Sequence, residues 1–272
     1  MQVGQVVKFR EVLEPNDAVA RYVVLEVGRS RDGQPGSRRV RWLEDSPGDD
    51  VPRDRYGLMI VLDLFAGTGS STAAFEQNHN VIRVELDRQH QAELHQDVTT
   101  LTVEQVIAVC GGRPDFIWAS PPCQAFSVAA IGRYWSEGGS DPKPKHPKAI
   151  EAQRVVRATL DLIHALRPAF WLLENPRGML RKLLMMGYYE RRTVTYCRYG
   201  DERQKPTDLW GVMPDSWIPR PTCRAKMSCH QAAPRGSKTG TQGRVDAVER
   251  SRVPFELSRE ICEHVERALS RT

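Results

Sequence analysis

The sequence has little of what marks membrane, secreted or repeat proteins. No apolar run approaches the roughly 20 residues that cross a bilayer, and the amino terminus shows no signal-peptide pattern. Only six cysteines occur in 272 residues. That is too few for a disulfide scaffold in a chain of this length, so we expect reduced thiols. Since no internal repeat is visible either, we expect a cytoplasmic globular protein with one substantial core.

The common phosphate-binding motifs are missing as well, because neither GxGxxG nor the P-loop lysine occurs. A different glycine turn is present, DLFAGTGS at 63–70, between an apolar run and a segment of helical pattern. Glycines in such a turn let the backbone approach a nucleotide-like ligand closely. The turn therefore predicts a ligand site that does not depend on phosphate.

Strand-like and helix-like patterns alternate from residue 58 onward, which is typical of an α/β fold with a doubly wound, mostly parallel sheet. The expected strands span 58–63, 81–86, 115–119, 169–174 and 191–196. The expected helices span 71–77, 103–109 and 149–166, with a last helix that Ser258 would cap.

Composition divides the chain into four parts. Residues 1–57 hold three short β-prone runs between turn clusters, which predicts a small β-rich module. Residues 58–199 form the main domain, 200–250 a short irregular basic segment, and 251–272 a helix that returns to the main domain. Residues 181–250 contain fourteen Lys or Arg but seven Asp or Glu. Such a basic concentration suits a polyanion such as DNA, although a solvated loop is the alternative.

One cysteine lies where a nucleophile is plausible on physical grounds. Residues 115–119 (DFIWA) predict a buried strand that two prolines end, and Cys123 follows directly. It would thus lie at the carboxyl end of a strand, where open α/β sheets bind ligands. Gln124 and Ser127 place polar groups beside the sulfur. The alternative is an inert core cysteine.

Three motifs together resemble the S-adenosylmethionine-dependent DNA (cytosine-5) methyltransferases of phage and bacterial type. They are the glycine turn, SPPCQAFS at 120–127, where the family has PCQxFS, and LENPRG at 173–178. The resemblance covers about residues 58–272 and implies a Rossmann-like methyltransferase fold. It implies S-adenosylmethionine as the cofactor and duplex DNA with a flipped cytosine as the partner. A monomer in bacterial or phage-infected host cytoplasm, in a restriction-modification context, is expected.

For the cofactor, the resemblance assigns the glycine turn to methionine and ribose contacts. Glu85 would bind the ribose hydroxyls and Asp97 the adenine amino group, although Asp97 also fits a solvated turn. The cofactor-binding candidates are Asp63, Phe65, Ala66, Gly67, Thr68, Gly69, Glu85, Leu86, Asp97 and Pro121.

For catalysis, Cys123 would add to C6 of cytosine, which makes C5 nucleophilic. Glu174, with a pKa raised by burial, would relieve the charge that develops next to N3. Asn175 would hold the loop or the base through its amide. This interpretation requires Cys123 and Glu174 to lie together beside the glycine turn.

The sequence departs from the family in two places. Pro176 follows Glu-Asn where the family has valine, and the family's QxRxR stretch lacks its arginine pair here, so Arg203 or Lys205 is the candidate substitute. Basic residues of the following segment would contact phosphates. The DNA-binding candidates are Gln124, Ser127, Arg203, Lys205, Arg224, Lys226, Arg235, Lys238 and Arg244.

A zinc site is a further hypothesis. Cys197, Cys223, Cys229 and His230 offer four ligands, but their spacing is not a standard C-x2-C pair, and reduced structural thiols are the alternative. The function also has rivals: the same chemistry on RNA, and a catalytically silent DNA-binding homologue.

Overall fold

The computed structural model describes residues 58–136, 142–224, 227–231 and 246–270, and the backbone of three strands nearer the amino terminus. These strands are β1 (Val6–Val7), β2 (Tyr22–Arg29) and β3 (Pro35–Trp42). They pair antiparallel in the order β1-β2-β3, in agreement with the β-rich pattern of this range. Four of the predicted DNA contacts, Lys226, Arg235, Lys238 and Arg244, lie outside the described residues.

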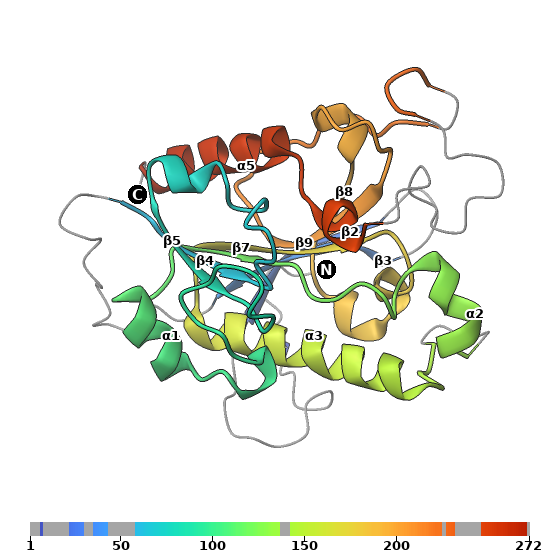
Figure 1. Cartoon of the computed structure of the whole chain (residues 1–272), viewed down its shortest axis with the longest axis horizontal. Helices are drawn as coiled ribbons and strands as arrows, with labels where there is room; N and C mark the ends of the chain where they lie inside the picture. Colours follow the sequence, from blue (N-terminus) through green and yellow to red (C-terminus); the bar gives the residue numbers. More distant parts are fainter. Residues whose placement is uncertain are drawn as a thin grey trace.

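The main sheet has the order β5-β4-β6-β7-β9-β8 (Figure 1). Its strands are β4 (Ile60–Leu64), β5 (Asn80–Val84), β6 (Phe116–Ala119), β7 (Phe170–Pro176), β8 (Arg191–Thr195) and β9 (Pro206–Val212). Strands β5, β4, β6 and β7 are parallel, whereas β9 runs antiparallel to both of its neighbours. The predicted doubly wound, mostly parallel sheet is therefore confirmed.

Helices cover both faces of this sheet. Figure 1 shows α1 (Val103–Cys110) and α3 (Pro147–Leu166) on one face and α5 (Phe255–Leu269) on the other. Two short helices, α2 (Ile131–Tyr134) and α4 (Ala247–Ser251), and several 3-10 turns lie in the connections. The 3-10 turns are η1 (Phe75–Gln77), η2 (Val98–Thr100), η3 (Val128–Ala130), η4 (Leu180–Lys182), η5 (Leu184–Met186) and η6 (Tyr196–Tyr199). Among the described residues, no helix is long and apolar enough to cross a membrane.

Local signals fix where these helices begin and end. The Thr102 hydroxyl accepts a hydrogen bond from the Gln105 N–H, and the Gln105 side chain accepts one from the Thr102 N–H. This capping box starts α1. Gly111 ends this helix in the left-handed conformation, with φ 71°, which glycine adopts without steric cost. Pro147 occupies the first turn of α3, where a missing N–H is harmless. The predicted helices at 103–109 and 149–166 are thus confirmed to within two residues.

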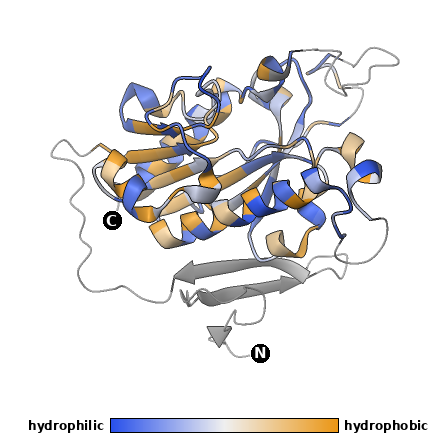
Figure 2. Ribbon diagram, turned by 60° about the horizontal axis from the view of Figure 1, so that its bottom comes forward, coloured by the Kyte–Doolittle hydropathy of each residue, from blue (hydrophilic) through white to orange (hydrophobic). Residues whose placement is uncertain are grey.

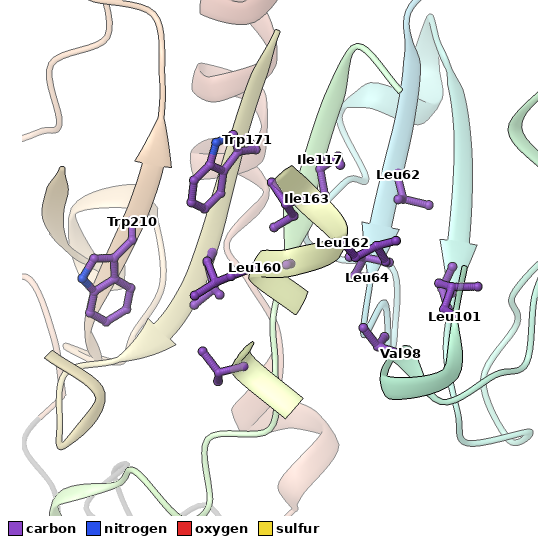
Figure 3. Packing of buried hydrophobic residues seen from close by; sticks show 14 of the residues in the cluster. Leu62, Leu64, Val98, Leu101, Ile117, Leu160, Leu162, Ile163, Trp171 and Trp210 are labelled. Carbon is purple, nitrogen blue, oxygen red and sulfur yellow. The ribbon is translucent and has the colours of Figure 1, made fainter. Parts of the chain in front are cut away.

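The core has two halves, one on each face of the sheet, because strand side chains alternate between the faces. Figure 3 shows Leu62, Leu64 and Ile117 of the strands packed with Leu160 and Ile163 of α3. On the opposite face the core residues include Val61, Phe116, Trp118, Leu172, Ile261 and Val265. Figure 2 shows the hydrophobic strands inside and hydrophilic segments at the periphery. Burying each large apolar side chain contributes about 1.5–3 kcal/mol, so the sheet is a rigid base for the loops at its end.

Two expectations about helices were wrong. Residues 71–77 form turns and the 3-10 turn η1 instead of a helix, because the hydroxyls of Ser71 and Thr72 bond to the Asp63 carboxylate, at 2.7 and 2.8 Å. The last helix begins at Phe255, so Ser258 lies inside it. The Ser258 hydroxyl accepts a hydrogen bond from the Ala74 N–H at 3.2 Å, and it therefore joins α5 to the turn after the glycine loop.

Strand β9 falls in the range that we expected to be irregular. Its buried Asp208 is paired with Arg181 and also accepts a hydrogen bond from Thr193, which removes the cost of an unpaired charge in the sheet. Gly211 is required because a Cβ there would lie 2.2 Å from the Trp171 carbonyl oxygen of β7. Residues that weaken a strand pattern in the sequence are thus compensated by tertiary partners.

Candidate active site

The order of the strands places the candidate site. Strands β5 and β6 lie on opposite sides of β4, so the chain reverses its winding between β4 and β6. Open α/β sheets bind ligands at such a switch point, outside the carboxyl ends of the strands. The glycine turn follows β4 there and the Cys123 loop follows β6. The Ser120 N–H donates to the Leu64 carbonyl at 3.0 Å and joins the two loops at their base.

The Cys123 loop is fixed by bonds to its backbone carbonyls. The Cys123 carbonyl accepts from the N–H groups of Phe126 and Ser127, both at 3.0 Å, and the Ala125 carbonyl accepts from the Trp135 indole at 2.8 Å. Phe126 and Trp135 are fully buried, whereas Cys123 itself is half-buried. The loop therefore holds a reachable sulfur on a rigid support.

The loop after β7 holds the Cys123 loop from the other side. The Asn175 amide donates to the Pro121 carbonyl at 3.0 Å, and the Met179 N–H donates to the Phe126 carbonyl at 2.7 Å. Gly178 packs so tightly there that a Cβ would lie 2.2 Å from the Phe126 oxygen. Asn175 thus connects the two motifs that the sequence analysis joined only by resemblance. Pro176 continues β7 and pairs with Thr207 of β9.

Glu174 lies at the carboxyl end of β7, adjacent to β6, and only 6% of its surface is exposed. Burial raises the pKa of its carboxyl group, as we expected, while the Lys205 ammonium and a hydrogen bond from Tyr196 lower that pKa. The Tyr196 hydroxyl donates to the Glu174 carboxylate at 3.0 Å. The acid is therefore buried, oriented by one tyrosine and placed in the field of one cation.

Lys205 is the cation that faces the site. Burial lowers the pKa of its ammonium group, and the charges of Glu174 and Cys123 oppose this effect. Its Nζ lies 4.5 Å from the Tyr196 ring centroid and 3.5 Å from the Ser251 carbonyl oxygen. Lys205 has a φ of 25°, an uncommon value for a residue with a side chain. The backbone is thus bent at the point that directs this lysine toward the acid and the thiol.

The Cys123 thiol responds to the same groups. Burial raises its pKa, and the Glu174 carboxylate raises it further, whereas the positive charges of Lys205 and Arg250 lower it. Such mutual effects require that the four side chains lie within electrostatic reach of one another. Cys123 and Glu174, which the sequence interpretation required to lie together, are thus within electrostatic reach of each other, and Lys205 lies near both.

The glycine turn is held to the end of β5 through Glu85. One carboxylate oxygen accepts from the Gly67 N–H at 2.9 Å, and the other accepts from the N–H groups of Leu86 and Asp87 at 2.8 and 2.9 Å. Phe65, Gly67 and Gly69 all have positive φ values, so the turn is tightly wound. A Cβ at Gly67 would have no heavy atom within 4 Å, so this part of the backbone faces open space.

The remaining cofactor candidates are of three kinds. Asp63 is fully buried beneath the turn, and burial raises the pKa of its carboxyl group to about 6. Asp97 caps η2, since its carboxylate accepts from the Thr99 backbone and hydroxyl. Thr68 and Leu86 are exposed, while Ala66 and Pro121 are buried. Asp63 thus supports the turn, and exposed ligand-facing surface is offered by Gly67, Thr68 and Leu86.

Arg203 has a different setting from the one expected of a DNA contact. Its side chain is buried, and all five guanidinium N–H donors are used by the Asp201 carboxylate and the carbonyls of Glu249, Arg250 and Arg252. Because no donor is left for a phosphate, Arg203 fastens the 201–203 turn to α4 and the residues after it. The other described candidates, Gln124, Ser127 and Arg224, lie at least partly exposed.

Two residues of this site were missed by the sequence analysis. Tyr196 is bonded to Glu174 from β8's end, and Arg250 acts on the Cys123 thiol from α4. No local pattern marks either residue, because both reach the site through tertiary packing. The only sequence signal was that Tyr196 lies just before the segment that stands in for QxRxR.

The candidate metal ligands are also brought together. The ligand atoms of Cys197, Cys223, Cys229 and His230 all lie within 4.8 Å of one another. Cys197 directly follows Tyr196 in η6.

Several known methyltransferases are similar to this chain. The family model "C-5 cytosine-specific DNA methylase" matches residues 59–184. A frog virus 3 protein described as a probable DNA (cytosine-5)-methyltransferase is 28% identical over 173 residues, which covers 63% of this chain and 78% of that protein. The type II methyltransferase M1.HphI of Haemophilus parahaemolyticus is 30% identical over 132 residues, or 43% of this chain and 32% of the relative. The chain thus spans about a third of M1.HphI.

Solved structures with a similar fold include the Entamoeba histolytica methyltransferase EhMeth, at 11% identity and a TM-score of 0.40, covering 61% of this chain and 57% of that one. The S. pombe Dnmt2 methyltransferase has 17% identity and a TM-score of 0.38, covering 57% and 49%. The range that the family model matches includes the glycine turn, the Cys123 loop and Glu174. Over residues 59–184 the chain is thus similar to the C-5 cytosine-specific DNA methylases, the family whose model matches this range.

Proposed function

We propose that the protein transfers a methyl group from S-adenosylmethionine to C5 of cytosine in DNA, through a transient covalent bond between Cys123 and C6. The observation that carries this proposal is the grouping of a half-buried thiol and a buried carboxyl group, at the carboxyl ends of adjacent strands, with a lysine that directly precedes the antiparallel strand β9. A structural cysteine has no need of such neighbours. Perturbed pKa values in one cluster are instead typical of catalytic sites.

The residues at the glycine turn fit the expected cofactor. The open backbone at Gly67 accepts close approach of a ligand, the Glu85 carboxylate lies at its rim, and exposed Leu86 offers apolar surface for an adenine ring. These groups match a ligand with a ribose and a base but without phosphate. When bound, S-adenosylmethionine supplies an electrophilic methyl group.

The chain's own residues would make cytosine reactive toward that methyl group. The Cys123 thiol gives its proton to solvent, from which it regains one after turnover, and the sulfur adds to C6, so the electrons of the C5–C6 double bond become available at C5. Glu174, whose pKa is raised by burial, donates a proton to N3 and prevents negative charge from building on the ring. Lys205 stabilises the thiolate before attack.

Product release reverses the two steps in which the protein takes part, sulfur addition to C6 and proton donation to N3. Once C5 has gained the methyl group, its proton leaves to solvent or a base, the C6–sulfur bond breaks and the thiolate is restored. The proton on N3 returns to Glu174. The enzyme is thus unchanged after one turnover, which covalent catalysis requires.

The cytosine must leave the duplex to reach a sulfur on a half-buried loop. Gln124 and Ser127 flank Cys123 at the surface and are proposed to contact the displaced nucleotide or its neighbours. Exposed Arg224 and the basic residues at 226, 235, 238 and 244 are proposed phosphate contacts, which would make binding weaker at high salt.

The test uses labelled methyl donor with duplex DNA, a matched RNA duplex, and DNA in which 5-fluorocytosine replaces cytosine. We expect label at C5 of cytosine in DNA, and a stable protein–DNA adduct with the fluorinated duplex because fluorine cannot leave as a proton. The Cys123→Ser variant should give neither, while Cys110→Ser should behave as wild type. Label on RNA alone would mean that RNA and not DNA is the substrate. Label without an adduct would refute the covalent route.

A further inference from the structure

Three cysteines and one histidine from separate segments gather beside the proposed active site. Cys197 belongs to η6, which follows β8, and the other three lie in the segment 223–230. The Cys229 sulfur is 3.7 Å from the Cys197 sulfur and 3.7 Å from His230 Nδ1, and the Cys223 sulfur is 3.2 Å from His230 Nδ1. All four ligand atoms lie within 4.8 Å of one another.

These separations match the edges of a zinc tetrahedron. With Zn–S bonds of about 2.3 Å and Zn–N bonds of about 2.0–2.1 Å, the ligand atoms are about 3.6–3.8 Å apart. Two of the three printed separations have this value and the third is shorter. The widest pairs exceed an edge by at most about 1 Å, a gap that rotation of the half-buried Cys229 and His230 side chains closes.

The donor set selects the metal. Thiolates and imidazole are the ligands of structural zinc, and the group contains no carboxylate of the kind that calcium or magnesium prefers. Four protein ligands leave no open position, which distinguishes a structural site from a catalytic one.

The surroundings resemble the second coordination shell of a metal site. The Gln204 amide lies 3.5 Å from the Cys223 sulfur and donates toward it, and the Cys223 N–H is held by the Thr195 hydroxyl at 2.9 Å. Donors aimed at a sulfur stabilise its thiolate form and orient it toward a metal. An ordinary buried thiol, such as Cys110 on α1, has no hydrogen bond of this kind among the described residues.

We infer that Cys197, Cys223, Cys229 and His230 bind one structural Zn²⁺ ion that fastens the start of the basic segment to the catalytic sheet. Each cysteine loses its proton when it binds the metal, so loading releases up to three protons. The site joins η6, whose Tyr196 holds Glu174, to the segment that leads into the proposed DNA contacts. Zinc would thus fasten the start of the basic segment to η6, which contains the tyrosine that orients Glu174.

A second group, His79, Cys262 and Glu266, is the best control. It offers only one thiol. His79 Nε2 is already 2.7 Å from the Glu266 carboxylate, and His79 Nδ1 accepts from the Met59 N–H at 3.4 Å. With both ring nitrogens engaged, this group is a hydrogen-bonded cluster and not a comparable zinc site.

The test measures metal in the full chain, independently of methyl transfer. Protein purified from zinc-replete cells without chelator should contain one zinc per chain by mass spectrometry. Cys110→Ser and His79→Ala should keep that zinc, and the double variant Cys223→Ser/Cys229→Ser should lose it. Replacing zinc by Co²⁺ in wild type should give the visible bands of a tetrahedral site and the strong near-ultraviolet absorption of thiolate ligands.

The cobalt spectrum keeps the test decisive if the double variant fails to fold. Absence of zinc from wild type together with absence of the thiolate absorption would overturn the proposal. So would zinc retained in full by the double variant, zinc lost from His79→Ala alone, or a disulfide between Cys197 and Cys229 found by mass spectrometry of the protein prepared under reducing, metal-replete conditions.

Discussion

Replacing Gly178 by alanine tests whether the loop after β7 positions the nucleophile. An added Cβ would lie 2.2 Å from the Phe126 carbonyl oxygen and 3.2 Å from its carbon, whereas Cβ atoms essentially never approach closer than 3.0 Å. The loops must therefore separate by at least 0.8 Å. Phe126 is three residues from Cys123, and the carbonyls of Cys123, Ala125 and Phe126 all accept hydrogen bonds, so the sulfur should move with Phe126.

The expected loss follows from that distance. A misplacement of about 1 Å between reacting groups costs on the order of 100-fold in rate. The overpacking itself should cost about 1–3 kcal/mol of unfolding free energy, which leaves most of the protein folded. We therefore expect a fall of about 100-fold in single-turnover methyl transfer at saturating donor and DNA, with little change in binding of the donor.

Two glycine variants separate this effect from lost stability. Gly211→Ala creates the same 2.2 Å contact with the Trp171 oxygen between β7 and β9, far from the Cys123 loop, so it should lower stability with a much smaller change in rate. Gly132→Ala meets no atom within 4 Å and should change neither. A folded Gly178→Ala protein that turns over within about threefold of wild type would refute the positioning argument.

Three further changes have measurable outcomes. Lys205→Met should raise the pKa of the Cys123 thiol, so activity near neutrality should fall about 10-fold per unit of that pKa and recover as the pH rises. Tyr196→Phe should slow methyl transfer and raise the pKa of Glu174, read from the pH profile, because a bond of about 1.5–3 kcal/mol to the carboxylate is lost. Asp63→Asn should remove a pH-dependent penalty, so its stability relative to wild type should rise by roughly 3 kcal/mol between pH 4 and pH 7 in urea unfolding.

The sign of the Asp63 effect follows from its pKa. That pKa is about 6 in the folded protein and 3.8 by the ordinary value, so the folded state binds more protons between these limits and wild type loses stability as the pH rises through them. Lys182→Met, on the exposed surface, and Tyr199→Phe, whose hydroxyl bonds to Arg220, serve as controls for the other two variants. An unshifted pH profile in Lys205→Met, equal rates in the two tyrosine variants, or a pH-independent difference for Asp63→Asn would each contradict its prediction.

Local pattern was sufficient where one strand or helix determines its own form. The apolar runs of β4, β6 and β7 predicted the sheet, and the periodicity of α3 predicted that helix. Cys123 and Glu174 were found from their positions at strand ends together with the family resemblance. It failed where a partner distant in sequence decides. Asp208 looks like a loop residue until Arg181 pairs with it, and residues 71–77 look helical until Asp63 captures their hydroxyls.

Two charged residues of the basic segment at 200–250 show the same limit of sequence-based prediction. Arg203 and Lys205 are equivalent in the sequence, two residues apart and both basic. The structure separates them because Arg203 has a guanidinium fork that several carbonyls satisfy, while Lys205 has a single ammonium group directed at the site. Which basic residue supports the scaffold and which acts on the thiol is therefore a property of tertiary geometry.

Because Lys205 lies near both Glu174 and Cys123, the protonation states of these two groups are linked in the proposed mechanism. In the free enzyme the Lys205 charge lowers the pKa of both Glu174 and Cys123, while the Glu174 carboxylate raises that of the thiol. If N3 of cytosine takes up the Glu174 proton completely, Glu174 becomes a carboxylate beside the thiol. If N3 only shares that proton, Glu174 does not become fully charged. Full transfer before attack would thus disfavour the thiolate, so sulfur addition and proton donation to N3 should occur together. A solvent isotope effect on adduct formation in wild type that is abolished in Glu174→Gln is the expected signature, and its absence would separate the two events.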